Sequence, residues 1–320
     1  MLTKTDIFSG FLGAGKTTLI KKLIAEAYKG EKVVLIENEF GEIAIDGGFL
    51  RDAGVQITEM NSGCICCTLV GDFTKALGQV IEQYHPDRII IEPSGVGKLS
   101  DVARAVQSVE GIEIGLKITV IDSGRAKLYM RNFGEFFNDQ VANADILVFS
   151  RTQDCPEKLL NCAIEIVREI NAEAPLITTS WDKIDGKKIL EAQSLGNEIK
   201  ELEHVEHHCS CGCEDGDGEH HHHHHHADEI FVSWGKETAQ KFSRERIETI
   251  LSELEDDEKY GIVLRAKGFV DSTDGNWIYF DYVPGEPDIR TGESAVSGRV
   301  CVIGSKLNED NLKELFSIEK

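Results

Sequence analysis

The sequence contains a glycine-rich segment whose residue types and spacing suit it to binding phosphate groups. Gly10 is followed by four residues and then by Gly15-Lys16-Thr17. Glycines at these positions let the backbone curl, so that successive N–H groups point inward toward phosphate oxygens. The residues that would hold a nucleotide here are Gly10, Gly13, Ala14, Gly15, Lys16, Thr17 and Thr18.

Three side chains of this segment have separate expected roles. Lys16 should reach the β and γ phosphates, the Thr17 hydroxyl should ligate Mg²⁺, and Thr18 should contact the α phosphate. The alternative is a glycine turn that arose by chance. Because a β-branched run precedes the segment and an amphipathic helical pattern follows it, a phosphate loop is the stronger interpretation.

The carboxylate of Glu92, in Glu92-Pro-Ser-Gly95, is a further candidate for the same chemistry. It ends an apolar run, so in a parallel sheet it would stand at the carboxyl edge, where ligands bind in open α/β folds. Glu92 would there hold a Mg²⁺ water or orient the attacking water, and Gly95 would offer a backbone N–H to the γ phosphate. With Lys16 these are the candidate catalytic residues, although a strand-end Glu is also common on an ordinary surface.

The segment expected to recognise the base departs from the usual pattern. Many GTP-binding proteins carry Asn-Lys-x-Asp after a strand, with the Asp accepting two hydrogen bonds from guanine, whereas this chain has Ser150-Arg-Thr-Gln153. A Gln side chain offers one acceptor and one donor group, so it does not replace a bidentate carboxylate. We expect Ser150, Arg151 and Gln153 to contact the base, with a second contact from residues 178–180. The choice between GTP and ATP stays open.

Three cysteines lie within four residues, at Cys64, Cys66 and Cys67. They precede a helical pattern, and a helix N-terminus lowers the pKa of a thiol. Three thiolates can converge on one soft or borderline ion such as Zn²⁺ or Co²⁺, and they also admit Ni²⁺. Such a set leaves a tetrahedral site one ligand short, which favours an exchangeable metal. A redox dithiol or core cysteines are the alternatives, but adjacent Cys66 and Cys67 cannot easily face one core.

A second group of metal-ligand residues lies between positions 204 and 226, in a segment made almost wholly of His, Cys, Gly, Asp and Glu. This composition cannot build an apolar core, so we expect a mobile linker that binds Zn²⁺, Co²⁺ or Ni²⁺ in several coordination sets. Its candidate ligands are His207, His208, Cys209, Cys211, Cys213, His220, His222 and His224. An engineered tag and incidental metal binding by a solvated linker are the alternatives.

The elements that must position these residues form two patterns. Up to about residue 180, short β-branched runs alternate with helical patterns, which predicts βαβ units and a mostly parallel sheet. After about residue 229, strand and helix patterns predict a smaller α+β domain, with Asp274-Gly275 as a hairpin turn. We expect three parts: a P-loop NTPase α/β domain (1–186), a helix with a His/Cys-rich linker (187–228) and an α+β C-terminal domain (229–320). Asp154 is also expected to cap the helix that follows it, with Glu157 reaching back to the backbone of the cap residue.

The overall composition excludes several classes of partner. The chain has 320 residues and a formal net charge of −22. Binding nucleic acid or an anionic membrane takes clustered Lys and Arg, so neither is an expected partner. Apolar runs stay well short of the ~20 residues that span a bilayer, and the N-terminus lacks a signal-peptide pattern, from which we expect a cytoplasmic protein.

Four motifs together resemble the CobW family of metallochaperone GTPases: Gly-Phe-Leu-Gly-Ala-Gly-Lys-Thr-Thr, Glu37-Asn-Glu-Phe-Gly41, Gly-Cys-Ile-Cys-Cys and Glu-Pro-Ser-Gly. Arg265-Ala-Lys-Gly268 is similar to the family's C-terminal module. The base segment is where the chain departs from the family. The resemblance implies a slow GTPase, regulated by metal or client, that binds a divalent ion at Cys64, Cys66 and Cys67. The ion would be delivered to a client metalloprotein on hydrolysis.

The segment from Glu37 to Glu42 would correspond to a first switch. There Glu37, Glu39 or Glu42 would touch Mg²⁺, the transferred metal, or both in different states, and hydrolysis would loosen the site that the γ phosphate holds together. Two other classes of function stay open: a metal storage or buffer protein with vestigial hydrolysis, and an ATP-using P-loop phosphotransferase. A homodimer also stays open.

Overall fold

The computed structural model describes residues 2–37, 56–59, 70–199, 230–292 and 297–317. Its first domain is built on a seven-stranded sheet in which every paired neighbour is parallel, in the order β3-β2-β4-β1-β5-β6-β7. The strands are β1 (Thr3–Ser9), β2 (Val33–Glu37), β3 (Gln56–Glu59), β4 (Arg88–Glu92), β5 (Ile112–Asp122), β6 (Ile146–Ser150) and β7 (Leu176–Ile177). The predicted α/β class with a parallel sheet is confirmed.

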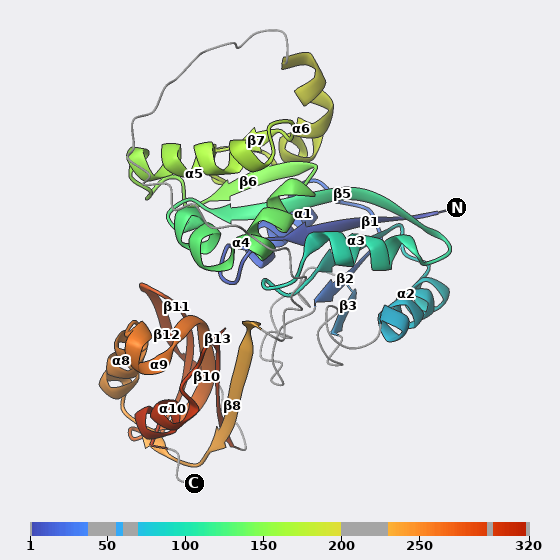
Figure 1. Ribbon diagram of the computed structural model, residues 1–320. Helices are drawn as coiled ribbons and strands as arrows, with labels where there is room; N and C mark the ends of the chain where they lie inside the picture. The colour runs from blue at the N-terminus through green and yellow to red at the C-terminus, as the bar shows by residue number, and fades with distance from the viewer. Residues whose placement is uncertain (1, 38–55, 60–69, 200–229, 293–296, 318–320) are drawn as a thin grey trace.

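Helices cover both faces of this sheet (Figure 1). One face is covered by α2 (Val70–Tyr84), α3 (Leu99–Gln107), α4 (Ala126–Ala142) and α5 (Glu157–Ile170), and the other by α1 (Lys16–Glu26) and α6 (Gly186–Ile199). Successive side chains of a strand point to opposite faces. Accordingly Ile89 and Ile91 of β4 join one apolar cluster while Ile90 joins the other. Burial on both faces explains why these strands read as continuous apolar runs.

One buried ion pair ties β1 to β4. Asp6 is fully buried and accepts hydrogen bonds from the Arg88 guanidinium at 2.6 Å, the Tyr28 hydroxyl at 2.7 Å and the Leu116 N–H at 2.8 Å. Arg88 also donates to Glu31 at 2.7 Å. A buried carboxylate costs little only when its lone pairs are satisfied in this way.

The C-terminal domain has a six-stranded, mainly antiparallel sheet in the order β12-β11-β10-β13-β8, with β9 paired to β10. Its strands are β8 (Val232–Thr238), β9 (Lys241–Phe242), β10 (Ile262–Ser272), β11 (Trp277–Val283), β12 (Glu286–Gly292) and β13 (Gly298–Ser305); its helices are α8 (Arg244–Glu253), α9 (Asp257–Tyr260) and α10 (Glu309–Leu315). The hairpin predicted at Asp274-Gly275 joins β10 to β11, and Gly275 has the positive φ that such a turn requires.

The helix cap predicted from Asp154 and Glu157 is wrong. Helix α5 begins at Glu157 with Pro156 at the N-cap position, and no side chain caps it. The helix starts after Pro156, so Asp154 lies two residues before the N-cap position and is not the capping residue. It instead accepts a hydrogen bond from the Gln153 side-chain amide at 2.8 Å.

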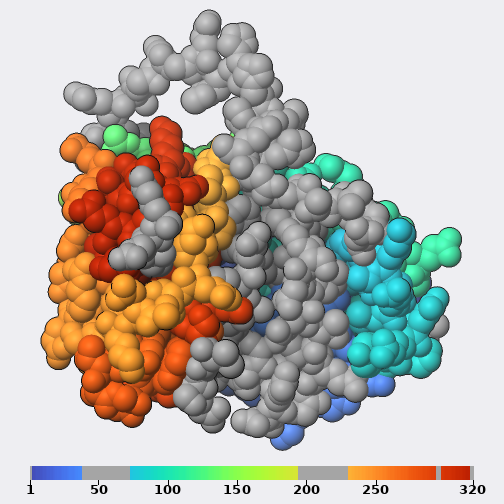
Figure 2. Space-filling model, turned by 90° about the horizontal axis from the view of Figure 1, so that it is seen from below, coloured from blue at the N-terminus to red at the C-terminus, as the bar shows by residue number. Residues whose placement is uncertain are grey.

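The two domains share part of one apolar core. Phe231 packs against Phe133 and Phe136 of α4, with ring centroids 5.0 and 5.1 Å apart, and Leu264 and Ile303 of the C-terminal sheet belong to the same cluster. Seen from below, the C-terminal domain (orange to red) occupies the left of the view and helix α2 (cyan) lies at the right (Figure 2). Among the described residues, no helix is both long and apolar enough to cross a membrane.

Candidate nucleotide-binding site

The predicted phosphate loop connects β1 to α1. Gly10, Gly13 and Gly15 all have positive φ, at 136°, 70° and 100°, so the chain turns where glycine is the residue that turns without strain. Gly10 also leaves room for β5, because a Cβ there would lie 2.3 Å from the Val120 carbonyl oxygen. Helix α1 then begins at Lys16 and directs its N-terminal N–H groups at the loop.

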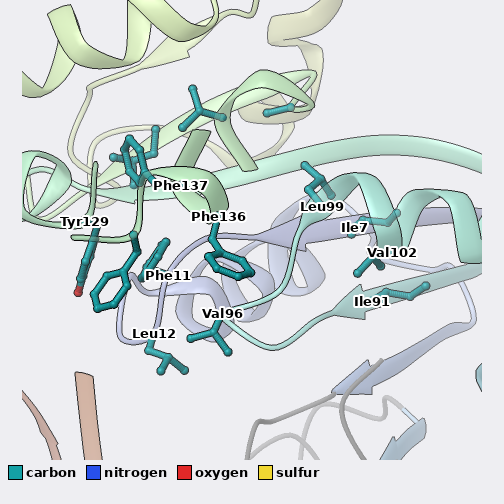
Figure 3. Packing of buried hydrophobic residues seen from close by; sticks show 14 of the residues in the cluster. Ile7, Phe11, Leu12, Ile91, Val96, Leu99, Val102, Tyr129, Phe136 and Phe137 are labelled. Carbon is teal, nitrogen blue, oxygen red and sulfur yellow. The ribbon is translucent and has the colours of Figure 1, made fainter. Parts of the chain in front are cut away.

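Phe11 anchors the loop in the core. Its ring stacks on Tyr129 with centroids 4.4 Å apart, and it also lies near Phe133 and Phe137 at 5.9 and 6.3 Å. Figure 3 shows Phe11 beside Tyr129, with Phe136 and Phe137 of α4 nearby, in the cluster of buried residues. The loop is thus positioned by packing as well as by its own backbone.

Lys16, Thr17 and Glu92 come together at the carboxyl edge of the sheet. The buried Lys16 ammonium donates to the carbonyl oxygens of Gly10 at 2.9 Å and Phe11 at 3.2 Å, and lies 4.0 Å from the Glu92 carboxylate. The Thr17 hydroxyl lies 3.1 and 3.0 Å from the two Glu92 oxygens. A hydroxyl and a carboxylate at this distance are the oxygen ligands that Mg²⁺ prefers, so the residues present fit this ion.

A second carboxylate residue shares this edge. Glu37 is the register partner of Glu92 across β2 and β4, and of Glu59 across β2 and β3. The carboxyl ends of these three neighbouring strands therefore stand level with one another. Glu37, which the sequence assigned to the metal site or the switch, is placed one strand from Glu92.

Gly95 lies directly against the phosphate loop. A Cβ at this position would be 2.5 Å from the Leu12 nitrogen and 2.9 Å from its Cα. The buried Gln140 amide of α4 holds the segment there, donating to the carbonyl oxygens of Gly95 at 3.2 Å and Gly97 at 2.8 Å. The structure thus brings two of the candidate catalytic residues, Glu92 and Gly95, to the same loop as Lys16.

An open pocket of about 430 Å³ adjoins the loop on its β6 and β7 side. It is lined by Ala14, Gly15, Thr18, Ser150, Arg151, Gln153, Ser180, Trp181 and Asp182. All three residues expected to contact the base, and three of the loop, therefore meet in one cavity. Of the segment 178–180, Ser180 lines it.

Trp181 and Asp182 were missed by sequence reasoning. They follow β7 within five residues, and their position just beyond a strand's carboxyl end was the signal available. Trp181 donates from its indole N–H to the Phe149 carbonyl at 2.9 Å, and its ring lies 3.1 Å from where a Cβ on Gly15 would stand.

Arg151 is held on three sides. Its guanidinium donates to Asp122 at 2.7 Å and to the Gly13 carbonyl at 2.9 Å, and it lies 2.8 Å from Glu286 of the C-terminal domain. These contacts stabilise a backbone φ of 56°, which is uncommon outside glycine. Arg151 thereby joins the end of β6 to the phosphate loop.

The turn between β11 and β12 meets the phosphate loop. A Cβ on Gly13 would lie 2.4 Å from a methyl group of Val283, so the loop backbone and the C-terminal domain are in close contact. Arg125 donates to the Pro284 carbonyl and lies 3.4 Å from Glu286. Nothing in the local sequence signals this contact.

Most of the predicted transition-metal ligands lie outside the described residues: Cys64, Cys66, Cys67, Glu42, and the linker residues His207, His208, Cys209, Cys211, Cys213, His220, His222 and His224. Within the described ranges, no group of three or more His, Cys, Asp or Glu is placed to hold a metal ion. Glu37 is the one predicted transition-metal ligand that the described part of the chain includes, at the end of β2.

The glycine-rich loop, the Lys16-Thr17 pair with Glu92, and the parallel sheet around them define a P-loop nucleotide-binding protein. Residues 4–178 match the family described as CobW/HypB/UreG, nucleotide-binding domain, and residues 231–318 match the cobalamin synthesis protein cobW C-terminal domain. The chain belongs to the CobW family.

Three relatives illustrate the range of similarity. Zinc chaperone CobW of Sinorhizobium sp is 28% identical over 330 aligned positions, which cover 92% of this chain and 85% of the relative. Zinc-regulated GTPase metalloprotein activator 1 of Schizosaccharomyces pombe is 27% identical, covering 87% and 74%. Zinc chaperone YeiR of Escherichia coli is 31% identical over 188 residues, which are 58% of this chain and 57% of YeiR.

Proposed function

We propose that this protein is a GTP-hydrolysing metallochaperone. It binds a divalent transition metal, Zn²⁺ or Co²⁺, as cargo through Cys64, Cys66 and Cys67 with Glu37 and Glu42, and delivers the ion to a client metalloprotein. Support comes from the family, and from relatives that are named zinc chaperones or a GTPase metalloprotein activator. The cysteine assignment itself rests on the sequence.

The observation that carries the proposal is the shared edge of Glu92, Glu37 and Glu59. Glu92 contacts Thr17 of the phosphate loop, Glu37 is its register partner, and β3 ends at Glu59, five residues before Cys64. From β1 to β3 there are three strand spacings of about 4.8 Å, or about 14 Å. A chain that leaves β3 at this edge starts within reach of the nucleotide.

The described residues are suited to phosphoryl transfer by positioning and charge. Lys16 and the N-terminus of α1 offset the negative charge of the β and γ phosphates, and the Gly95 N–H adds a donor beside the loop. Thr17 and Glu92 would hold Mg²⁺, which when bound supplies further neutralisation of the phosphates. Glu92 also orients the attacking water.

Coupling between nucleotide and cargo follows from the position of Glu37. The segment that begins there would be ordered by a γ phosphate, and it would bring its carboxylates to the cysteines. Loss of the γ phosphate would release that segment and weaken the cargo site. The binding free energies of nucleotide and metal must then depend on each other reciprocally.

The test is an anaerobic Zn²⁺ titration of the full chain with a non-hydrolysable GTP analogue, with GDP and without nucleotide. We expect the tightest Zn²⁺ binding with the analogue and a loss of that difference in Cys66→Ser. Equal Zn²⁺ affinity in all three states would refute the coupling. Removing residues 204–226 should lower the Zn²⁺ stoichiometry and leave hydrolysis intact; a metal store would instead lose most of its Zn²⁺ with the linker.

A further inference from the structure

In the pocket beside the phosphate loop, which we call the base pocket, Gln153, Ser180 and Asp182 form a wall rich in hydrogen-bond acceptors. The Ser180 hydroxyl lies within hydrogen-bond distance of both the Gln153 side-chain oxygen, at 3.3 Å, and an Asp182 carboxylate oxygen. Since Ser180 has one proton, it donates to one of them at a time. Its bond to Asp182 also lowers the pKa of that carboxyl below its ordinary value.

Gln153 presents its oxygen to this wall because its other end is occupied. The side-chain amide N–H₂ donates to Asp154 at 2.8 Å, away from Ser180. The Gln153 oxygen and the Asp182 carboxylate therefore both offer lone pairs to the pocket. A ligand that fits this wall must bring at least two donors.

The wall is fixed relative to the phosphate loop. Trp181, next to Asp182, is held by the Phe149 carbonyl and packs over Gly15. On the other side of Asp182, the N–H of Gly186 donates to Glu26 of α1 at 2.7 Å, and Lys183 closes a turn on the Ser180 carbonyl at 2.9 Å. Asp182 thus lies in a short segment that is tied at both ends to elements of the nucleotide site.

Guanine is the purine whose edge matches this wall. Its N1–H and N2–H₂ groups are adjacent donors, which one carboxylate can accept together. Adenine presents an N1 lone pair and an N6–H₂ donor, so its N1 would face a carboxylate with like charge density. Asp182 is exposed, so its selectivity rests on its fixed position: a base without the matching donors leaves this acceptor unpaired at the edge of the pocket.

We propose that Asp182, in the segment after β7, is the guanine-specificity residue of this protein and replaces the carboxylate that Gln153 lacks. Gln153 then contributes its oxygen as a second acceptor, with Ser180 bridging the two. The inference rests on the proposed function in that the nucleotide site is taken to bind GTP. Beyond that function, the inference identifies the residue that selects guanine over adenine.

The experiment is calorimetric binding of guanosine, xanthosine and adenosine diphosphates, with Mg²⁺, to the full chain and to Asp182→Asn. In the variant, the amide still accepts from N1–H but donates where the carboxylate accepted, which suits the C2 oxygen of xanthine. We expect guanosine diphosphate to bind at least about tenfold more weakly and xanthosine diphosphate at least about tenfold more tightly. Glu157→Gln, which removes an exposed carboxylate from α5, is the charge-matched control.

A second variant tests the same contact independently, in case Asp182→Asn disturbs the fold. Asp182→Ala should bind guanosine and inosine diphosphates equally, because the contact to N2–H₂ is lost, whereas the unmodified chain should prefer guanosine. If Asp182→Asn and Asp182→Ala keep the guanosine preference of the unmodified chain, the assignment of Asp182 is wrong and the proposed function stands. If the unmodified chain itself prefers adenosine, or binds no nucleotide, the proposed GTPase function fails first.

Discussion

The Glu286 carboxylate of the C-terminal domain lies 2.8 Å from the guanidinium of Arg151, and the same guanidinium nitrogen donates to the Gly13 carbonyl of the phosphate loop. One residue thus links the base pocket, the phosphate loop and the second domain. Val283 also packs on Gly13, so the C-terminal domain is in direct contact with the phosphate loop.

Removing the carboxylate in Glu286→Ala should weaken nucleotide binding modestly. The pair is part-exposed and Asp122 still holds Arg151, so we expect a rise in the KM for GTP of about two- to fivefold. The matched control is Asp288→Ala, which removes an exposed carboxylate from the same strand, β12, and should leave KM unchanged. Equal effects of the two substitutions would show that Glu286 acts through net charge alone.

Adding a methyl group at Gly95 should damage the phosphate loop. In Gly95→Ala the new Cβ would meet the Leu12 backbone at 2.5 Å, and backbone cannot yield as a flexible side chain does. We expect loss of nucleotide binding together with a stability loss of about 1–3 kcal/mol, measured by nucleotide titration and urea unfolding.

Gly78→Ala in α2 is the control for this substitution, because a Cβ there meets nothing within 4 Å. It should leave nucleotide binding intact and stabilise the protein by up to about 1 kcal/mol through helix propensity. If Gly95→Ala binds nucleotide as well as Gly78→Ala does, the close contact between Gly95 and the loop plays no part in nucleotide binding.

The Thr17 hydroxyl should be needed for Mg²⁺-dependent hydrolysis. Thr17→Val keeps the shape of the side chain but removes the oxygen that lies 3.0 Å from Glu92, and we expect kcat to fall about a hundredfold or more. Thr17→Ser retains the hydroxyl and should keep most of the activity. A Thr17→Val protein with the same Mg²⁺ dependence as the unmodified chain would contradict this role.

Breaking the buried pair between Arg88 and Asp6 should cost stability without touching the nucleotide site. Arg88→Ala leaves a carboxylate that is 1% exposed without its counter-charge, and we expect a loss of about 3–5 kcal/mol in the free energy of unfolding. Arg104→Ala, which breaks an exposed pair with Asp101, should change it by less than about 1 kcal/mol. Similar urea midpoints for both variants would show that burial does not decide the effect.

Local sequence was enough for the phosphate loop and for the alternation of strands and helices. Glycine spacing is a backbone property of a few consecutive residues, and a parallel strand buried on both faces reads as an apolar run such as Ile89 to Ile91. Glu92 could also be predicted from the sequence, because its position at a strand end follows from the same apolar run. Strand β12 could not be predicted, since its residues are mostly exposed and polar and form a strand only by pairing with β11.

Long-range packing decided which residues line the base pocket and which part of the C-terminal domain contacts the phosphate loop. Gln153 and Asp182 follow different strands, and they meet only because β6 and β7 are neighbours in the sheet. Glu286 reaches Arg151 across 135 positions of sequence, through a domain contact that no local pattern encodes. Hydrophobic periodicity reports which face of an element is buried, but it does not report the element that buries it. The set of acceptors that line this pocket and the link to the second domain are therefore properties of the tertiary structure.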